Sequence, residues 1–192
     1  MSTPTALVLA SASPRRRELL AAHGIACVVD PSSVPEAPRP DEAAADFAAR
    51  VAGEKASEVA RRHPHAHVLG ADTVVVVDGA VFGKPADADD ARRIVRMLFS
   101  APHKVITGLA LVWRDRGIEQ VRGAVTVVIP RALTEAQVEA HIRGGDWEGK
   151  AGAYGIQECG DAFVERIDGS FTNVMGLPME LVEEMLKLYN MH

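Results

Sequence analysis

The sequence lacks several features that would assign a chain to a class at once. It has only two cysteines, Cys27 and Cys159, too few and too far apart for a disulfide framework or a cysteine-ligated metal. Their scarcity favours a reducing compartment. No run reaches the ~18 apolar residues that a membrane span needs, and no basic, apolar secretory leader precedes the first strand-like run. These absences predict a cytoplasmic chain with no membrane partner.

Positive charge is scarce as well, since 21 Lys and Arg stand against 26 Asp and Glu, for a net charge of −5. A non-specific nucleic-acid binder needs a broad basic face, so this balance argues against a nucleic-acid partner. Basic residues occur instead in small groups, at Arg15 to Arg17, Lys55, Lys84 and Lys150. This distribution suits a small anionic ligand better than a polymer.

The first apolar run, Ala6 to Ala10, predicts a short buried strand. Ser13 is a good N-cap and Pro14 suits the first helical position, so we expect a helix from Pro14 to about His23. Further expected elements are strands at 25–29, 74–77, 105–113, 118–129 and 162–167, and helices at 41–62, 87–100, 134–144 and 179–188. Asp41 is expected to cap the second helix, Thr134 and Gln137 to form a capping box, and Asp78-Gly79 to form a two-residue hairpin turn. His103, taken alone, is expected to be structural rather than catalytic. The glycine-rich stretch 147–160 shows neither a helical nor a strand period.

Three arginines, Arg15 to Arg17, fall in the first turn of that first helix. Cations are unfavourable there because the helix dipole is positive at its N-terminus, and a docked anion would reverse the sign. Backbone N–H groups, the hydroxyls of Ser11 and Ser13, and the guanidiniums could together form a phosphate cradle. The alternative is that the arginines are solvated and the serines only cap.

Asp72 interrupts a β-branched strand, where an unpaired carboxylate would be costly to bury. We expect it to meet a cation, a metal or a backbone donor. A structural aspartate that bonds a loop is the alternative. On pattern alone, Glu36 in the proline-rich connection is a solvated loop acid, Lys55 is a surface residue that packs its stem, and Lys84 lies at a rigid corner before Pro85.

Seven motifs, spread in order over nearly the whole chain, resemble the successive motifs of the Maf family of nucleoside triphosphate pyrophosphatases. They are Leu9-Ala-Ser-Ala-Ser-Pro-Arg-Arg-Arg-Glu-Leu-Leu20, Glu54-Lys-Ala56, Gly70-Ala-Asp-Thr-Val74, Gly83-Lys-Pro85, His103-Lys-Val-Ile-Thr-Gly108, Lys150-Ala-Gly-Ala-Tyr-Gly-Ile-Gln157 and Asn173-Val-Met-Gly-Leu-Pro178.

The resemblance implies an α/β fold in one domain over residues 1–192. Two closely packed lobes would surround a long mixed sheet flanked by helices, similar to inosine triphosphate pyrophosphatase, with the nucleotide in the cleft. It implies hydrolysis between the α- and β-phosphates of a nucleoside triphosphate, giving a monophosphate and pyrophosphate, with Mg2+ or Mn2+ as cofactor. It also suggests a homodimer.

The resemblance further implies roles for single residues. Asp72 corresponds to the general base and a metal ligand, and Glu36 to an acid that helps hold the metal. Lys55 and Lys84 would be catalytic residues that act at the phosphates, together with the substrate-binding residues Ser11, Ser13, Arg15 and Arg16. The positions of Arg15, Thr73 and Gln157 would set substrate preference.

Within the family, Thr73 and the run that ends at Gln157 look like the dTTP/UTP branch, with modified pyrimidine nucleotides left open as substrates. A glutamine amide can donate to and accept from a uracil or thymine edge. The stretch 158–161 departs from that branch, which usually has glycine and alanine there. A different class of function stays open beside the enzyme: a nucleotide-binding regulator of cell division and septum formation with little catalysis.

Overall fold

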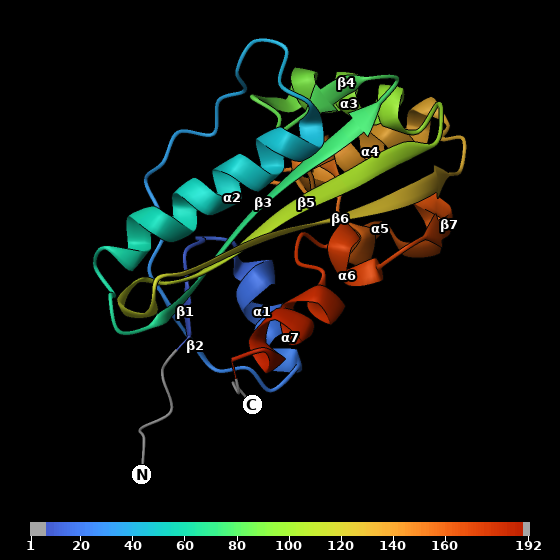
Figure 1. Ribbon diagram of the computed structural model, residues 1–192. Helices are drawn as coiled ribbons and strands as arrows, with labels where there is room; N and C mark the ends of the chain where they lie inside the picture. The colour runs from blue at the N-terminus through green and yellow to red at the C-terminus, as the bar shows by residue number, and fades with distance from the viewer. Residues whose placement is uncertain (1–6, 190–192) are drawn as a thin grey trace. The chain divides into compact units, whose positions relative to one another are not determined.

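The structure is a computed structural model that describes residues 7–189, apart from the side chains of Glu158, Cys159 and Asp161 (Figure 1). Its elements are β1 (Leu7–Leu9), α1 (Pro14–Ala22), β2 (Cys27–Val29), α2 (Ala44–Ala60), β3 (His67–Val77), β4 (Ala80–Phe82), α3 (Ala88–Leu98), β5 (His103–Trp113), η1 (Arg114–Arg116), β6 (Ile118–Pro130), α4 (Glu135–Gly144), η2 (Ala151–Ala153), α5 (Ile156–Phe163), β7 (Val164–Asp168), α6 (Phe171–Val174) and α7 (Met179–Lys187).

Seven strands form one sheet in the order β2-β1-β3-β5-β6-β7, and β4 pairs with β3 at its side. β1 pairs in parallel with β2 and β3, whereas the β3–β4 and β6–β7 pairs are antiparallel. The implied α/β fold with a mixed sheet flanked by helices is therefore confirmed. The chain divides into two compact units, residues 7–72, 107–124 and 176–189 (unit 1) and residues 73–106 and 125–175 (unit 2).

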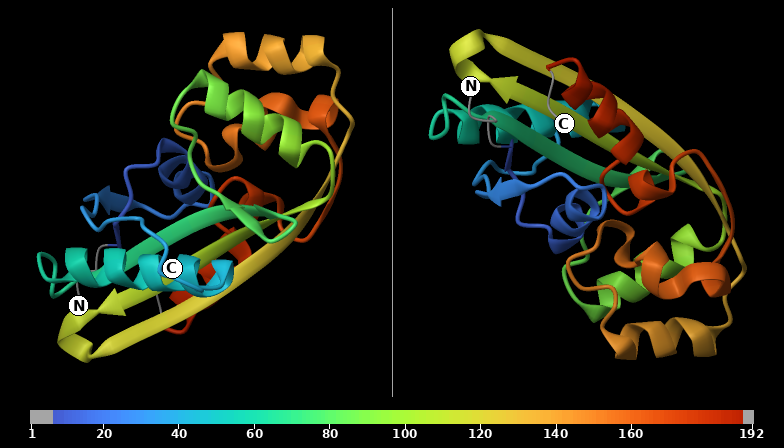
Figure 2. Two further views of the ribbon diagram at one scale, coloured as in Figure 1. Left: turned by 90° about the horizontal axis from the view of Figure 1, so that it is seen from above. Right: turned by 90° about the horizontal axis from the view of Figure 1, so that it is seen from below.

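In unit 1, α2 lies against β3 and β5 because two glycines allow its backbone to approach. A Cβ on Gly70 would lie 2.3 Å from the Ala52 carbonyl oxygen, and one on Gly108 would lie 2.3 Å from the Ala48 carbonyl oxygen. Both views of Figure 2 show α2 on one face of these strands and α7 on the other. This contact brings the buried face of α2, which includes Lys55, onto β3.

Unit 2 has a core of aromatic and branched aliphatic side chains. Phe99 packs edge-on against Tyr154 and Phe163, with ring centroids 5.1 and 5.3 Å away. On its surface, Arg92 and Arg96 of α3 form ion pairs with Glu139 and Glu135 of α4, respectively. The glycine-containing segment between α4 and β7 packs into this core, with Ala153 fully buried.

Several local predictions are confirmed. The strand within 6–10 appears as β1, although Ala6 lies outside the described residues. The Asp78-Gly79 hairpin joins β3 to β4, and both residues have positive φ, at 47° and 79°. Thr134 and Gln137 form the predicted capping box at the start of α4, which ends at Gly144 with Gly145 as its C-cap residue.

Other local predictions are wrong. Asp41 does not cap α2; it has a φ of 56°, and α2 begins after Ala43 without a side-chain cap. Ser13 is the N-cap residue of α1, but its hydroxyl makes no capping bond. The stretch 147–160 contains η2 and most of α5, whose eight residues include the non-helical Gly160. So short and interrupted a helix offers too few positions to show a 3.6-residue period.

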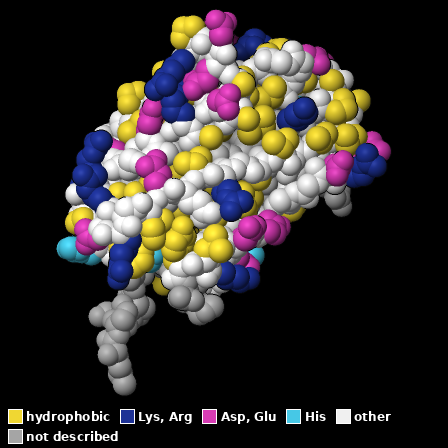
Figure 3. All heavy atoms as spheres, viewed as in Figure 1, with side chains coloured by type: hydrophobic (Ala, Val, Ile, Leu, Met, Phe, Trp, Pro, Cys, Tyr) yellow, Lys and Arg dark blue, Asp and Glu magenta, His cyan; other side chains and the backbone are white. Residues whose placement is uncertain are grey.

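No helix among residues 7–189 is long and apolar enough to cross a membrane. Over the face seen in Figure 3, Lys and Arg side chains are scattered among Asp and Glu side chains rather than gathered together. That face offers none of the continuous basic surface on which non-specific nucleic-acid binding relies.

Candidate active site

Lys55 joins two acidic residues that are distant in sequence. Its Nζ lies 2.7 Å from Asp72 Oδ1 and 2.6 Å from Glu36 Oε1. The side chains of Lys55 and Asp72 are each only 7% exposed, whereas that of Glu36 is 43% exposed. The interpretation of Lys55 as a surface residue is therefore wrong, and the expectation that Asp72 meets a cation is confirmed.

The local fold explains why these three groups meet. Asp72 lies two residues after Gly70 in β3, so its side chain projects from the same face of the strand as a Cβ added at Gly70 would. That face is where α2 approaches closely, and Lys55 lies on the buried side of α2 beside Ala56, the other residue that a Cβ on Gly70 would meet. Gly70 thus sets the short distance between the ammonium and the carboxylate.

The environment makes Asp72 a stronger base than an ordinary aspartate. Burial raises its pKa, because the charged carboxylate loses solvation. The positive charges of Lys55 and Arg16 oppose this rise, and the negative charge of Glu36 adds to it. A carboxylate with a raised pKa accepts a proton from water more readily, which suits general base catalysis.

Arg16 is buried and ties the start of α1 to the strand that carries Asp72. Its Nη1 donates to Ser11 Oγ at 2.9 Å and to the Ala71 carbonyl at 2.8 Å, and its Nε donates to the Gly176 carbonyl at 2.9 Å. Burial lowers the pKa of the Arg16 guanidinium. These bonds place a fixed positive charge one residue from Asp72.

The remaining members of the predicted phosphate cradle are in the same turn. Ser11 is buried, and its Oγ also accepts from the Ser13 N–H at 3.3 Å. Ser13 and Arg15 are half-buried. The structure thus brings Ser11, Ser13 and Arg16 together, while their contact with phosphate stays a prediction.

The other predicted site residues lie in unit 2. Thr73, next to Asp72 in β3, is half-buried, whereas Lys84, after β4, and Gln157, in α5, are exposed. The segments that carry Lys84 and Gln157 are joined, because the Gly152 N–H donates to the Gly83 carbonyl at 3.0 Å.

Two buried histidines support the segment before Gln157. His103 Nε2 lies 2.8 Å from the Tyr154 hydroxyl, and its Nδ1 lies 2.9 Å from the Leu98 carbonyl. His141 Nε2 lies 2.8 Å from the carbonyl of Ala153, a residue with a φ of 60°. Burial lowers the pKa of His103, which favours the neutral ring. These are structural roles, as the sequence analysis expected for His103; it gave no signal for His141.

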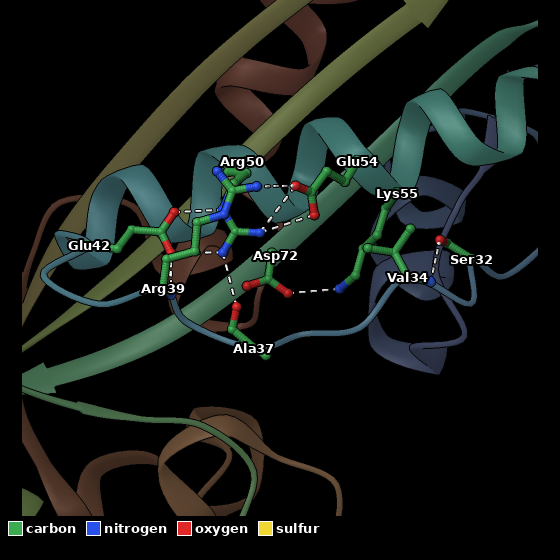
Figure 4. A network of polar contacts seen from close by, with 9 residues as sticks. All are labelled: Ser32, Val34, Ala37, Arg39, Glu42, Arg50, Glu54, Lys55 and Asp72. Atoms are coloured by element: carbon green, nitrogen blue, oxygen red, sulfur yellow. Dashed lines mark hydrogen bonds and ion pairs between the residues drawn. The ribbon is translucent and has the colours of Figure 1, made fainter.

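Sequence analysis also missed a set of ion pairs beside Lys55. Figure 4 shows Arg50 of α2 pointing toward Glu42, Glu54 and the Ala37 carbonyl, on the connection that carries Glu36. The spacing of Arg50 and Glu54, four residues apart on a helix, could have signalled one of these pairs. The others join residues whose proximity depends on the path of an irregular connection.

No group of three or more His, Cys, Asp and Glu residues that could hold a metal is found within the described part of the chain. Asp72 and Glu36, however, approach the same ammonium nitrogen, so their oxygens are already arranged around a cation. Mg2+ is commonly bound by one or two carboxylates together with substrate phosphates. This donor set fits such an ion.

Comparisons with known proteins place the whole chain among related sequences. The family model described as "Maf-like protein" matches residues 6–189. Proteins named "dTTP/UTP pyrophosphatase" are similar along nearly the whole chain. That of Geobacter metallireducens is 48% identical over 93% of this chain and 94% of the relative, and that of Geobacter sulfurreducens is 46% identical over 95% and 96%. That of Moorella thermoacetica is 45% identical over 95% and 94%.

Among solved structures, that of a HAM1 protein from Coxiella burnetii covers 96% of this chain and 99% of its own. Its TM-score is 0.49 and its sequence identity 16%. A likeness at this level carries no argument about the site.

Proposed function

Because this chain belongs to the Maf-like protein family, we propose that it is a nucleoside triphosphate pyrophosphatase acting on dTTP and UTP. It hydrolyses the bond between the α- and β-phosphates and releases the nucleoside monophosphate and pyrophosphate. The observation that carries this proposal is the buried Asp72, whose raised pKa and contact with Lys55 suit a base beside a phosphate chain.

In this reaction Asp72 takes a proton from the water that attacks the α-phosphorus. Lys55 holds the Asp72 carboxylate in place through their 2.7 Å contact and adds positive charge where negative charge develops. Arg16, held by three acceptors, orients the turn that presents Ser11 and Ser13 to phosphate oxygens. We assign Arg15 and Lys84 to phosphate binding on their match to the family motifs.

Asp72 and Glu36 are the residues that would hold a divalent cation, Mg2+ or Mn2+. When bound, such an ion polarises phosphoryl oxygens and offsets the charge of the leaving pyrophosphate. Glu36 suits this role because it is the more exposed of the two carboxylates and lies on a connection rather than inside a strand. Asp72 can then serve as both ligand and base.

Substrate preference is assigned to Thr73 and Gln157. The exposed Gln157 amide can both donate and accept hydrogen bonds, which matches the edge of uracil or thymine. The paired part of the β3–β4 hairpin begins two residues after Thr73, and the Gly152 N–H, five residues before Gln157, donates to the Gly83 carbonyl. A homodimer and a cytoplasmic location stay predictions from the sequence.

The test is pyrophosphate release from ATP, GTP, CTP, dTTP, UTP and 5-methyl-UTP, with and without Mg2+ or Mn2+. In H2 18O, attack at the α-phosphorus places the label in the monophosphate and none in pyrophosphate. We expect metal-dependent release concentrated on dTTP and UTP. Similar turnover of all the triphosphates would remove the assignment of Thr73 and Gln157.

Asp72→Asn should lower kcat by about 100- to 10,000-fold, the range for loss of a general base, while the fold is retained. The matched control is Asp78→Asn in the exposed hairpin, where the left-handed backbone also accepts asparagine. Near-normal turnover in Asp72→Asn would exclude Asp72 as the base. Nucleotide binding without any release in the natural chain would instead support the regulatory alternative.

A further inference from the structure

Glu36 lies in a connection without regular secondary structure, between β2 and the start of α2. The connection is rich in proline and its side chains are largely exposed. Nevertheless, Glu36 is held within 2.6 Å of Lys55. Something must fix this connection on α2, since an irregular segment does not hold a carboxylate at one distance by itself.

On the C-terminal side of Glu36, the connection is bonded to Arg50 of α2. Its Nη2 donates to the carbonyl of Ala37, the next residue along the chain, at 3.0 Å. The same guanidinium grips Glu42 with two bonds, Nε to Oε1 at 2.6 Å and Nη2 to Oε2 at 2.7 Å. Figure 4 shows that the guanidinium lies between α2 and the connection, so its contacts reach both.

The remaining guanidinium nitrogen of Arg50, Nη1, bonds to a residue of the same helix. Nη1 lies 3.2 and 3.1 Å from the two carboxylate oxygens of Glu54, one turn further along α2. The side chains of Arg50 and Glu42 are only 16% and 10% exposed. A planar guanidinium with several donors in fixed directions can serve all these acceptors together, whereas a lysine ammonium cannot.

Glu42 takes part as a permanently charged partner. The bonds from Arg50 lower the pKa of Glu42 to about 2, so it is ionised at all ordinary pH values. Glu42 also accepts from the backbone N–H of Arg39 at 3.0 Å, which closes the far end of the connection. The N-terminal end of the connection is fixed separately, because Arg62 and His63 contact the carboxylate of Asp30.

We propose that Arg50, together with Glu42, is a positioning residue that clamps residues 36–42 to α2 and thereby presents the Glu36 carboxylate at the active site. Arg50 acts through Glu36 and does not itself contact substrate or metal. This inference rests on the proposed function for its catalytic consequence, but the clamp itself is a property of the free protein.

The test combines Arg50→Lys and Glu36→Gln, alone and together, with two measurements. Hydrogen–deuterium exchange is recorded on the protein without metal or nucleotide. Activity is measured as a function of Mn2+ concentration. Arg50→Lys should speed amide exchange in peptides covering 31–43 and leave peptides of β1 unchanged. It should raise the Mn2+ concentration for half-maximal activity by about tenfold, since residues that orient metal ligands typically affect metal affinity by 10- to 100-fold.

The double variant distinguishes positioning from general destabilisation. If Arg50 acts through Glu36, adding Arg50→Lys to Glu36→Gln should change the Mn2+ dependence no further. The control is Arg61→Lys, an exposed arginine directly after the same helix, which should leave both measurements unchanged. Effects that multiply in the double variant, or unchanged exchange in 31–43, would overturn the inference. If the natural chain released no pyrophosphate, the proposed function would fail while the exchange measurement still tested the clamp.

Discussion

In unit 1 the candidate residues are held by charges, whereas in unit 2 the corresponding segments are held by backbone bonds and aromatic packing. Lys55 lies between two carboxylates, and Arg50 fixes the connection next to one of them. In unit 2 the segment before Gln157 is held by Gly152, bonded to Gly83, and by His103, bonded to Tyr154.

The difference has a physical consequence. An exposed member of a charged network, such as Glu36, can exchange partners at modest cost when a competing charge arrives, whereas breaking the buried contact of Lys55 and Asp72 is costly. A packed segment with buried bonds does not adapt in this way, since a moved group leaves neighbours unsatisfied. We therefore expect Glu36 in unit 1 to change partners when a cation binds, and the packed segment of unit 2 to keep its conformation.

The strongest way to break the comparison is Gly70→Ala, because it tests whether unit 1 also depends on packing. The added Cβ would lie 2.3 Å from the Ala52 carbonyl oxygen and 2.9 Å from the Ala56 nitrogen, so α2 must move. We expect a loss of about 3 kcal/mol in unfolding free energy, at the upper end for overpacking, measured by urea denaturation. Turnover should fall too, since Lys55 moves with α2.

The control for this change is Gly83→Ala, where an added Cβ meets nothing within 4 Å and φ is ordinary. It should leave the urea midpoint nearly unchanged. If Gly70→Ala behaved like this control, α2 could shift without cost, and the charges alone would position Lys55.

A smaller effect is expected from His103→Gln, which tests the packed support of unit 2. Loss of the bonds to Tyr154 and Leu98 should cost about 1–2 kcal/mol at pH 8, as for a buried hydrogen bond left unmade. Amide exchange should rise in peptides covering 150–157 and stay unchanged in 31–43. Faster exchange in both segments would contradict the view that His103 supports only the packed segment of unit 2.

His103 also predicts a pH dependence of stability. Burial lowers its pKa in the folded protein, so the unfolded chain binds the proton more readily. The unfolding free energy should therefore fall as pH drops below about 6.5, the pKa of an unperturbed histidine. Burial also lowers the pKa of His67 in unit 1, so His67→Gln and His103→Gln are compared as single variants. Each should reduce the slope between pH 7 and 5, and an unchanged slope in His103→Gln would contradict its assignment as a neutral buried ring.

Sequence reasoning succeeded where the signal is local or where charge makes burial costly. The capping box at Thr134 and the hairpin at Asp78 involve neighbouring residues with fixed conformational preferences. Asp72 could be identified because a carboxylate in an apolar strand requires a partner. The partner, Lys55, could not be identified from its own helix, since its burial depends on how closely Gly70 lets α2 approach β3. That contact joins residues far apart in sequence.

The clamp on Glu36 was beyond prediction for a related reason. Arg50 and Glu54 share a helix face, but Ala37 and Glu42 reach Arg50 only through the path of the connection. No periodicity describes such a path. The resemblance to the family implied a role for Glu36, and the contacts of Arg50 explain why an exposed loop acid can hold one position.

The smallest expected effect sharpens the comparison within unit 1. In the pH profile of kcat/KM, the acidic limb reports the pKa of the base in the free enzyme. For Asp72, burial raises this pKa. The positive charges of Lys55 and Arg16 lower it, and the negative charge of Glu36 raises it. Glu36→Gln removes a negative charge, so the acidic limb should move to lower pH. The same change at the exposed Glu119 should leave the limb in place. A shift to higher pH would mean that Glu36 mainly holds Lys55 against Asp72, because loss of that ordering would weaken the contact that lowers the pKa.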